Sequence, residues 1–324
     1  MKAKARAHTN IALIKYWGKA DKALKLPLMS SISMTLDAFY TETEFEHDPK
    51  ISESSFYLND VKQSPAQSQR VFDYINELQK KYNLDPNENF EIHSYNHVPT
   101  SAGLASSASA FAALAACFAK SYQLDLDKTQ LSRLARLGSG SATRSIFGGF
   151  VEWIKGDNDL NSYAQALNEH PDWDLHMLAV EVNTKQKKIS SSKGMELAQH
   201  SNYYQDWLKQ NDSEIQAMKS AISNHDFSTL GQISENSANE MHAMNLTANP
   251  GFTYFEPDTI SLINLVHELR NSGIECYYTI DAGPNVKILC TLRNSKKIIS
   301  AIHNLLGNVK IVNAGFGPGI EYLD

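Results

Sequence analysis

The sequence predicts an α+β protein with antiparallel sheets and packed helices, and two patterns carry that prediction. Residues 41–45, 56–58 and 90–92 alternate between apolar and polar side chains, with the period of two that is typical of strands. In 66–82, apolar residues recur three and four positions apart, as in an amphipathic helix. Because strands and helices do not alternate strictly along the chain, antiparallel sheets are favoured over a doubly wound fold.

The rest of the chain supplies further elements of both kinds. We expect helices at 105–122, 127–137, 257–271 and 294–306, helical stripes within 193–247, and strands at 146–154, 175–182, 275–281, 286–292 and 309–313. With 324 residues, about two domains of roughly 150 residues are expected. A boundary within 183–190 divides the chain into a first part, 1–184, and a second, 185–324.

Composition excludes several classes of protein. The chain has 30 basic and 36 acidic residues, a net charge of -6, so no overall positive field is available to bind nucleic acid. Its three cysteines are scattered and provide no zinc framework, which suits a reducing compartment. The longest apolar stretch, 110–119, is too short to span a membrane. We therefore expect a cytoplasmic protein with neither a nucleic-acid nor a membrane partner.

The segment 99–110 is rich in serine, glycine and alanine and leads into an alanine-rich helix. The N-terminus of a helix offers free N–H groups to an anion, and small side chains allow a phosphate to approach them. The hydroxyls of Ser106 and Ser107 could also ligate Mg²⁺. From the residues alone, a capped and tightly packed helix is equally compatible.

Two other segments place charged groups beside tight turns. In 138–145, Arg144 follows a serine-glycine stretch and could bind a carboxylate or phosphate through its planar fork, although a surface salt bridge explains it as well. Asp281 ends an apolar strand just before Gly283, which suits either proton transfer or the start of an Asx turn.

Two lysine-containing segments complete the set of candidates. In 10–19, Tyr16 and Lys19 flank a glycine and could hold an anion, or could form a solvated strand end. The basic run 185–188 abuts the serine-glycine segment 190–195, which favours either an electrostatic funnel for a small polyanion or a solvated charge run.

Four of these segments together resemble the diphosphomevalonate decarboxylase family of the GHMP kinase superfamily: 9–19, 99–110, 138–145 and 281–285. The resemblance extends over essentially the whole chain. It implies a two-lobed GHMP kinase fold with the active site in the cleft between lobes 1–184 and 185–324. It also implies ATP and Mg²⁺ as cofactors and a homodimer.

The activity implied by the resemblance is ATP-dependent. The 3-hydroxyl of 5-diphosphomevalonate is phosphorylated, and loss of phosphate and CO2 then gives isopentenyl diphosphate. By the same match, Asp281 would orient or deprotonate the hydroxyl, and Arg144 would hold the carboxylate. Lys19 completes the catalytic set that the resemblance implies.

The resemblance also assigns binding residues. For the substrate these are Tyr16, Trp17, Gly18, Lys19, Arg70, Ser139, Gly140, Ser141, Ala142, Thr143, Arg144, Ser191 and Ser192. For ATP they are Gly103, Leu104, Ala105, Ser106, Ser107 and Lys187, with Ser106 also on the metal. Ser192 stands where many bacterial relatives have arginine, so a decarboxylase that acts on the monophosphate stays open. A 3-kinase that stops at phosphorylation and a non-catalytic sensor are further alternatives.

Overall fold

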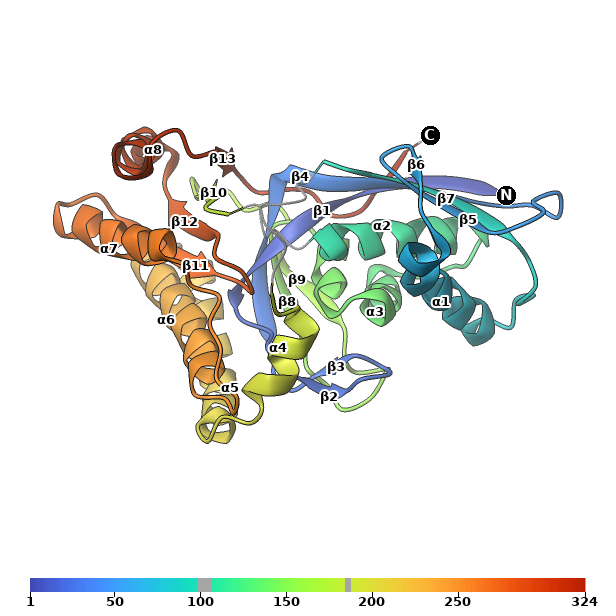
Figure 1. Cartoon of the computed structure of the whole chain (residues 1–324), viewed down its shortest axis with the longest axis horizontal. Helices are drawn as coiled ribbons and strands as arrows, with labels where there is room; N and C mark the ends of the chain where they lie inside the picture. Colours follow the sequence, from blue (N-terminus) through green and yellow to red (C-terminus); the bar gives the residue numbers. More distant parts are fainter. Residues whose placement is uncertain (98–105, 184–187, 324) are drawn as a thin grey trace.

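The computed structural model describes residues 1–97, 106–183 and 188–323. Figure 1 shows an elongated molecule with one sheet and the helices that cover it on one side, and a smaller sheet with further helices on the other. The long strands β1 and β4 run through its middle. Within the described residues, no helix has the length and apolar character needed to cross a membrane.

The larger sheet has the order β14-β1-β4-β7-β5-β6, with β8 and β9 attached beside β4. Its strands are β1 (Lys2–Ile14), β4 (Ser31–His47), β5 (Ser55–Leu58), β6 (Val61–Lys62), β7 (Phe90–Asn96), β8 (Phe150–Trp153), β9 (Ala164–Asn168) and β14 (Glu321–Leu323). All pairings except β5 with β7 are antiparallel. The predicted strands at 41–45, 56–58 and 90–92 are therefore confirmed.

Three helices cover one face of this sheet: α1 (Pro65–Lys81), α2 (Ser106–Ser121) and α3 (Lys128–Gly138). The alanines of α2 are almost all buried, because small side chains let the helix lie close to β1 and β4. Phe45 and Phe118 meet edge to face, with ring centres 5.8 Å apart, inside this core. These three helices match the predicted ranges within one or two residues.

The smaller sheet is fully antiparallel, in the order β11-β12-β10-β13. Its strands are β10 (His176–Val180), β11 (Cys276–Ile280), β12 (Val286–Cys290) and β13 (Ile311–Ala314), and its helices are α4 (Ser191–Ala198), α5 (Tyr204–Ser223), α6 (Phe227–Leu246), α7 (Pro257–Asn271) and α8 (Leu292–Leu306). Helices α7 and α8 form one apolar core with this sheet, while α6 contacts both β11 and β1. A short hairpin, β2 (Lys19–Asp21) with β3 (Leu26–Pro27), follows β1.

Two features of the topology differ from the expectation. The predicted strand at 146–154 begins only at Phe150, because 140–146 winds into a 3-10 helix, η1 (Gly140–Ile146). Strand β10 precedes residue 184 yet pairs with β12 and β13, and β14 returns to pair with β1. The division at 184/185 stays a prediction, and the chain crosses between the two sheets more than once.

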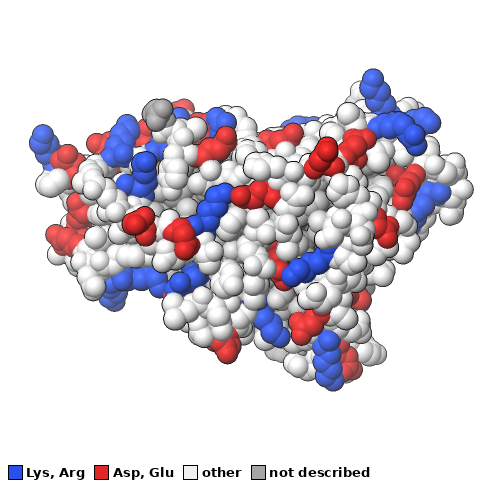
Figure 2. Space-filling model, turned by 180° about the vertical axis from the view of Figure 1, so that it is seen from behind, with Lys and Arg blue, Asp and Glu red and all other residues white. Residues whose placement is uncertain are grey.

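Charged side chains are mixed over the surface. Figure 2 shows basic and acidic residues interspersed on the face opposite to that of Figure 1. Many of them form pairs along the larger sheet, such as Lys2 with Glu44 at 2.7 Å and Arg6 with Glu42 at 2.6 Å. Such exposed pairs contribute little to stability individually.

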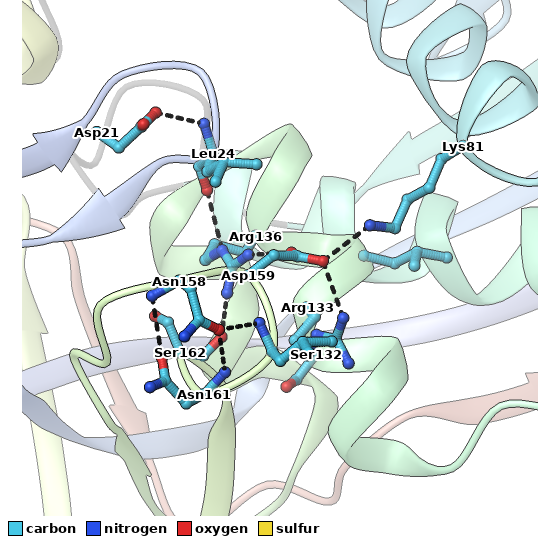
Figure 3. A network of polar contacts seen from close by, with 12 residues as sticks. Asp21, Leu24, Lys81, Ser132, Arg133, Arg136, Asn158, Asp159, Asn161 and Ser162 are labelled. Atoms are coloured by element: carbon cyan, nitrogen blue, oxygen red, sulfur yellow. Dashed lines mark hydrogen bonds and ion pairs between the residues drawn. The ribbon is translucent and has the colours of Figure 1, made fainter.

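A polar network fastens α3 to its surroundings (Figure 3). Asp159 accepts from Lys81 at 2.9 Å, Arg133 at 2.8 Å and the fully buried Arg136. Arg136 also donates to the carbonyls of Leu24 and Ser162. Burial alone would raise the pKa of Asp159, but the bonds from Lys81 and Arg133 outweigh it and lower that pKa to about 2. The network therefore ties α1, α3, the 157–162 loop and the segment before β3 together.

Replacing Asp159 by alanine tests this network. The change leaves the buried Arg136 guanidinium without its carboxylate, so the free energy of unfolding should fall by about 3 to 5 kcal/mol. Urea unfolding followed by circular dichroism measures the loss. The matched control is Asp206→Ala, which breaks the exposed pair with Lys209 and should cost less than about 1 kcal/mol. Equal losses in both variants would contradict the proposed importance of the Asp159 network.

Candidate active site

A cleft of about 460 Å³ opens between the two sheets, and residues from both parts of the chain line it. The predicted site residues among its lining are Tyr16, Trp17, Lys19, Arg70, Ser107, Ser139, Gly140, Ser141, Arg144, Ser191, Ser192 and Asp281. The cleft thus brings together the ends of β1, α3 and β11 with the starts of α2 and α4. Gly103, Leu104, Ala105 and Lys187 lie outside the described residues.

Asp281 lies at the end of β11 between two buried lysines. Lys15 Nζ is 2.7 Å from one carboxylate oxygen, and Lys287 Nζ is 3.2 Å from the other. The side chains of both lysines are only 2% exposed, against 25% for Asp281. Lys15 also donates to the carbonyl of Ala12 at 2.9 Å. The carboxylate is therefore held from both sides, with its remaining exposure toward the cleft.

The two ammonium groups set the charge of this carboxyl group. Burial disfavours an ionised carboxylate, but the nearby Lys15 and Lys287 outweigh that effect and hold the pKa of Asp281 well below its usual range. Burial, in turn, lowers the pKa of Lys15, although the Asp281 carboxylate opposes this. Asp281 is thus ionised throughout the neutral pH range. The alternative that Asp281 merely starts an Asx turn leaves its two lysine partners unexplained.

Arg144 lies in η1 and is 3% exposed, which excludes the alternative of a surface salt bridge. Its Nε donates to Asn10 Oδ1 at 3.0 Å, and its Nη1 donates to Ser31 Oγ at 2.6 Å. Burial lowers the pKa of Arg144 to about 10, and the Asp281 carboxylate opposes this shift, so the guanidinium stays charged at neutral pH. Its described partners are neutral, which leaves the positive charge available to an anion in the cleft.

The residues after β1 form one wall of the cleft. Tyr16 packs against Trp153, with ring centres 4.7 Å apart, and its buried hydroxyl has no hydrogen-bond partner among the described residues. Trp17 donates from Nε1 to Asn245 at 2.8 Å. A buried hydroxyl without a partner costs free energy, so the Tyr16 hydroxyl is suited to bind a polar ligand.

Three cations gather at one end of the cleft: Lys19, Lys25 and Arg70. Lys25 and Arg70 both donate to the carbonyl of Gly138, at 3.1 and 3.0 Å. Burial, followed by the charge of Arg70, lowers the pKa of Lys25 to about 8, and the same two causes lower that of Lys19. Mutual repulsion of this kind indicates a site that binds an anion with more than one charge.

Hydroxyl groups line the cleft between these charged groups. Ser139 Oγ is 3.4 Å from Ser107 Oγ and 3.3 Å from Ser141 Oγ. Ser191 and Ser192 form the first turn of α4, and Ser106 begins α2. Small hydroxyl side chains thus lie at two helix N-termini, and phosphate binding there stays a prediction.

Three predicted substrate residues, Gly18, Ala142 and Thr143, are absent from the described lining of the cleft. Ala142 and Thr143 are fully buried within η1. Thr143 donates to the carbonyl of Gly140 at 2.6 Å, which stabilises the 3-10 turn. The tight turn thus directs both side chains inward, and the role of all three residues in substrate binding stays a prediction.

The sequence analysis missed Lys15 and Lys287 and assigned a catalytic role to Lys19 instead. Lys19 lies at the cationic end of the cleft, whereas Lys15 is the lysine of that segment bonded to Asp281. A signal was present for each, because Lys15 follows the apolar run 11–14 and Lys287 interrupts an apolar strand. A lysine buried in this way needs an acidic partner, although sequence alone does not identify it.

The chain is similar to known proteins along most of its length. A family model described as the diphosphomevalonate decarboxylase-like N-terminal domain matches residues 7–164, and one for the mevalonate 5-diphosphate decarboxylase C-terminal domain matches 177–316. The chain belongs to the diphosphomevalonate decarboxylase family. Its architecture is accordingly the GHMP kinase fold, as predicted.

Individual relatives cover nearly the whole chain. The mevalonate diphosphate decarboxylase structure from Staphylococcus aureus is 45% identical, with a TM-score of 0.95 over 100% of this chain and 98% of that one. A solved complex with MVAPP, AMPPCP and magnesium is 43% identical, with a TM-score of 0.94 over 100% and 99%. Diphosphomevalonate decarboxylase from Ganoderma lucidum is 36% identical over 93% of this chain and 81% of its own length.

Gly18 provides a test of the packing that positions the residues after β1, which form one wall of the cleft. A Cβ at this position would lie 1.9 Å from Tyr204 Oη, the hydroxyl that donates to the Trp17 carbonyl at 2.6 Å. Gly18→Ala should therefore lower the free energy of unfolding by about 1 to 3 kcal/mol, through overpacking and through the strain of a side chain at the positive φ of Gly18. Thermal unfolding measures this change.

The double variant Gly18→Ala/Tyr204→Phe is the control, because it removes the clashing oxygen. The loss of stability caused by Gly18→Ala should be smaller in the Tyr204→Phe background than in the wild type. Equal losses in the two backgrounds would show that contact with Tyr204 is not the constraint.

Proposed function

We propose that this chain is a diphosphomevalonate decarboxylase, which converts 5-diphosphomevalonate and ATP to isopentenyl diphosphate, ADP, phosphate and CO2 in the mevalonate pathway. The observation that carries the proposal is the single cleft that joins an ionised Asp281, a buried Arg144 with its charge uncompensated by a bonded carboxylate, and a cluster of cations. The solved relatives include a complex with MVAPP, an ATP analogue and magnesium, which supports both substrates.

The first step is phosphorylation of the 3-hydroxyl. Asp281 accepts a hydrogen bond from that hydroxyl and orients its oxygen toward the γ-phosphate of ATP. With both carboxylate oxygens bonded to lysines, Asp281 is a weak base, so it acts mainly by orientation and by charge. Phosphoryl transfer depends largely on such positioning and on electrostatic stabilisation. As the hydroxyl oxygen bonds to the γ-phosphorus, the bond from that phosphorus to the β-phosphate oxygen breaks and ADP leaves. The hydroxyl proton passes along its hydrogen bond to Asp281 and from there to solvent.

The second step is loss of the new phosphate together with CO2. Arg144 holds the substrate carboxylate through the guanidinium that Asn10 and Ser31 keep in place. When the C–O bond to phosphate breaks, positive charge develops at the tertiary C3, and the electrons of the C–C bond to the carboxylate form the new double bond. Asp281 thus acts on the hydroxyl of C3, and Arg144 acts on the carboxylate that departs as CO2.

Phosphate groups are held at the two ends of the cleft. Lys19, Lys25 and Arg70 bind the substrate diphosphate with the hydroxyls of Tyr16, Ser139 and Ser141, and the main chain of Gly140, together with Ser191 and Ser192. The α2 N-terminus with Ser106 and Ser107 faces the phosphates of ATP. Gly103, Leu104, Ala105 and Lys187 also belong to the proposed ATP site. All of these assignments are part of the proposal.

Magnesium fits this set of groups. The described residues contain no cluster of three or more His, Cys, Asp or Glu side chains that could hold a metal. Mg²⁺ commonly takes phosphate oxygens and waters with only one or two protein ligands, so the hydroxyl of Ser106 suffices beside ATP. The ion supplies neutralisation of the phosphate charge.

The diphosphate is favoured over a monophosphate substrate. Ser192 does not offer the charge of an arginine, and the neighbouring Lys193 is exposed and pairs with Glu196 at 3.3 Å. The three cations Lys19, Lys25 and Arg70 nevertheless supply more charge than one phosphate needs. A sensor without activity would have no use for the buried ion cluster around Asp281.

A homodimer and a cytoplasmic location complete the proposal, and light scattering after size exclusion tests the dimer.

The assay that tests the function follows CO2, ADP and isopentenyl diphosphate together from purified protein with 5-diphosphomevalonate and Mg-ATP. Equal amounts of all three are expected. ADP without CO2 would indicate a 3-kinase, faster turnover of 5-phosphomevalonate would indicate the monophosphate enzyme, and no ADP from either substrate would favour the sensor.

Asp281→Ala tests the proposed orientation of the hydroxyl. Since groups at the reacting atoms commonly contribute about 10²- to 10⁴-fold, kcat should fall below about 1% of the wild-type value. Isothermal titration should still detect substrate binding. Activity above a few per cent of wild type would show that Asp281 is not needed at the reacting oxygen.

Arg144→Ala tests the carboxylate contact. The variant should lose far more in kcat than in affinity for ATP, because the guanidinium acts on the second step. Rates and ATP affinity are measured on the same preparation. Comparable losses in kcat and ATP affinity would indicate that Arg144 is structural, through its bonds to Asn10 and Ser31.

A further inference from the structure

Lys287 is a charged residue in the otherwise apolar strand β12, Val286-Lys287-Ile288-Leu289-Cys290. Its side chain is only 2% exposed. A buried ammonium is costly unless it is paired and hydrogen-bonded. Lys287 Nζ meets both conditions, with Asp281 Oδ2 at 3.2 Å and the carbonyl of Asn285 at 3.2 Å.

These contacts join the two ends of the turn that presents Asp281 to the cleft. Asp281 follows β11, Asn285 precedes β12, and residues 276 and 290 are paired at the far end of the hairpin. Lys15 holds the other carboxylate oxygen at 2.7 Å from the end of β1. With one ammonium on each oxygen, rotation of the carboxylate is restricted.

The titratable groups around Asp281 come from four elements. Lys15 follows β1 and Lys287 lies in β12, each in an ion pair with Asp281, and Arg144 lies in η1. His242 of α6 also faces this group, but burial, followed by the charge of Lys15, lowers its pKa to about 3. The ring is therefore neutral, and the cationic surplus around Asp281 comes from the two lysines and the arginine.

We propose that Lys287 is a positioning residue that keeps Asp281 ionised and aimed at the substrate hydroxyl. This inference rests on the proposed function, since it deepens the role of Asp281 in that reaction. Lys287 acts through Asp281 and through the Asn285 carbonyl, and it needs no contact with the substrate. Its effect is both electrostatic and geometric, because one ammonium binds the carboxylate and the turn that carries it.

Lys287→Gln removes the charge and keeps a polar side chain. Loss of a neighbouring cation should raise the pKa of Asp281 by about 1 to 3 units, so the acid limb of kcat/KM should move to higher pH. At neutral pH, kcat should fall by up to about 100-fold through misplacement of the carboxylate, with a smaller change in KM. Lys310→Gln, at an exposed lysine paired with Glu181 at 3.5 Å, is the control and should leave the profile unchanged.

A purely structural role of Lys287 would lower activity without moving the acid limb, and that outcome would overturn the proposal. Lys287→Arg, which keeps the charge, should retain the wild-type acid limb of kcat/KM. An acid limb about one pH unit or more above that of the wild type would also overturn the proposal. This variant can still refute the proposal if Lys287→Gln does not fold.

A second readout does not depend on activity. The carboxyl carbon of Asp281, assigned by its absence in Asp281→Asn, is followed by ¹³C NMR during a pH titration. It should titrate at higher pH in Lys287→Gln than in the wild type, and identical titrations would overturn the proposal. A different outcome is a wild-type protein that releases no CO2, while the Asp281 carbon still titrates at higher pH in Lys287→Gln than in the wild type. That result would refute the proposed function and leave the electrostatic role of Lys287 standing.

Discussion

The site depends on one partly buried carboxylate held between two buried ammonium groups. Lys15 comes from the end of β1 in the larger sheet, whereas Asp281 and Lys287 come from the β11–β12 hairpin of the smaller one. None of these charges could be buried alone without a large desolvation penalty. Their pairing therefore requires the two sheets to meet at this point. The cleft is a consequence of that meeting.

The surrounding contacts hold the end of β1 against α6 and the hairpin. The backbone N–H of Lys15 donates to Ser237 Oγ at 3.0 Å, and Trp17 Nε1 donates to Asn245, also on α6. On the other side, Asn10 within β1 bonds both Arg144 and Ser145 of η1. Through Lys15 and Asn10, β1 and the residue after it thus position both Asp281, which would act on the hydroxyl, and Arg144, which would act on the carboxylate.

The cationic end of the cleft is positioned separately. The last carbonyls of α3 accept from Lys25 and Arg70, so these two cations depend on where α3 ends. The network around Asp159 anchors the same helix through the buried Arg136 and reaches back to Leu24, beside Lys25. The side chains that would bind a diphosphate are therefore linked to a structural ion cluster outside the cleft.

Most helices and strands could be predicted from the amino-acid sequence, because hydrophobic periodicity depends on neighbouring residues, and four motifs indicated the family. Short elements such as β9 and β14, whose pairing partners are remote in the chain, and the winding of 140–146 into η1 could not be predicted in this way. The bonds of Lys15 and Lys287, rather than Lys19, to Asp281 became evident from the folded chain alone. Charge pairing acts across space between residues 266 positions apart, and no local pattern encodes such a contact.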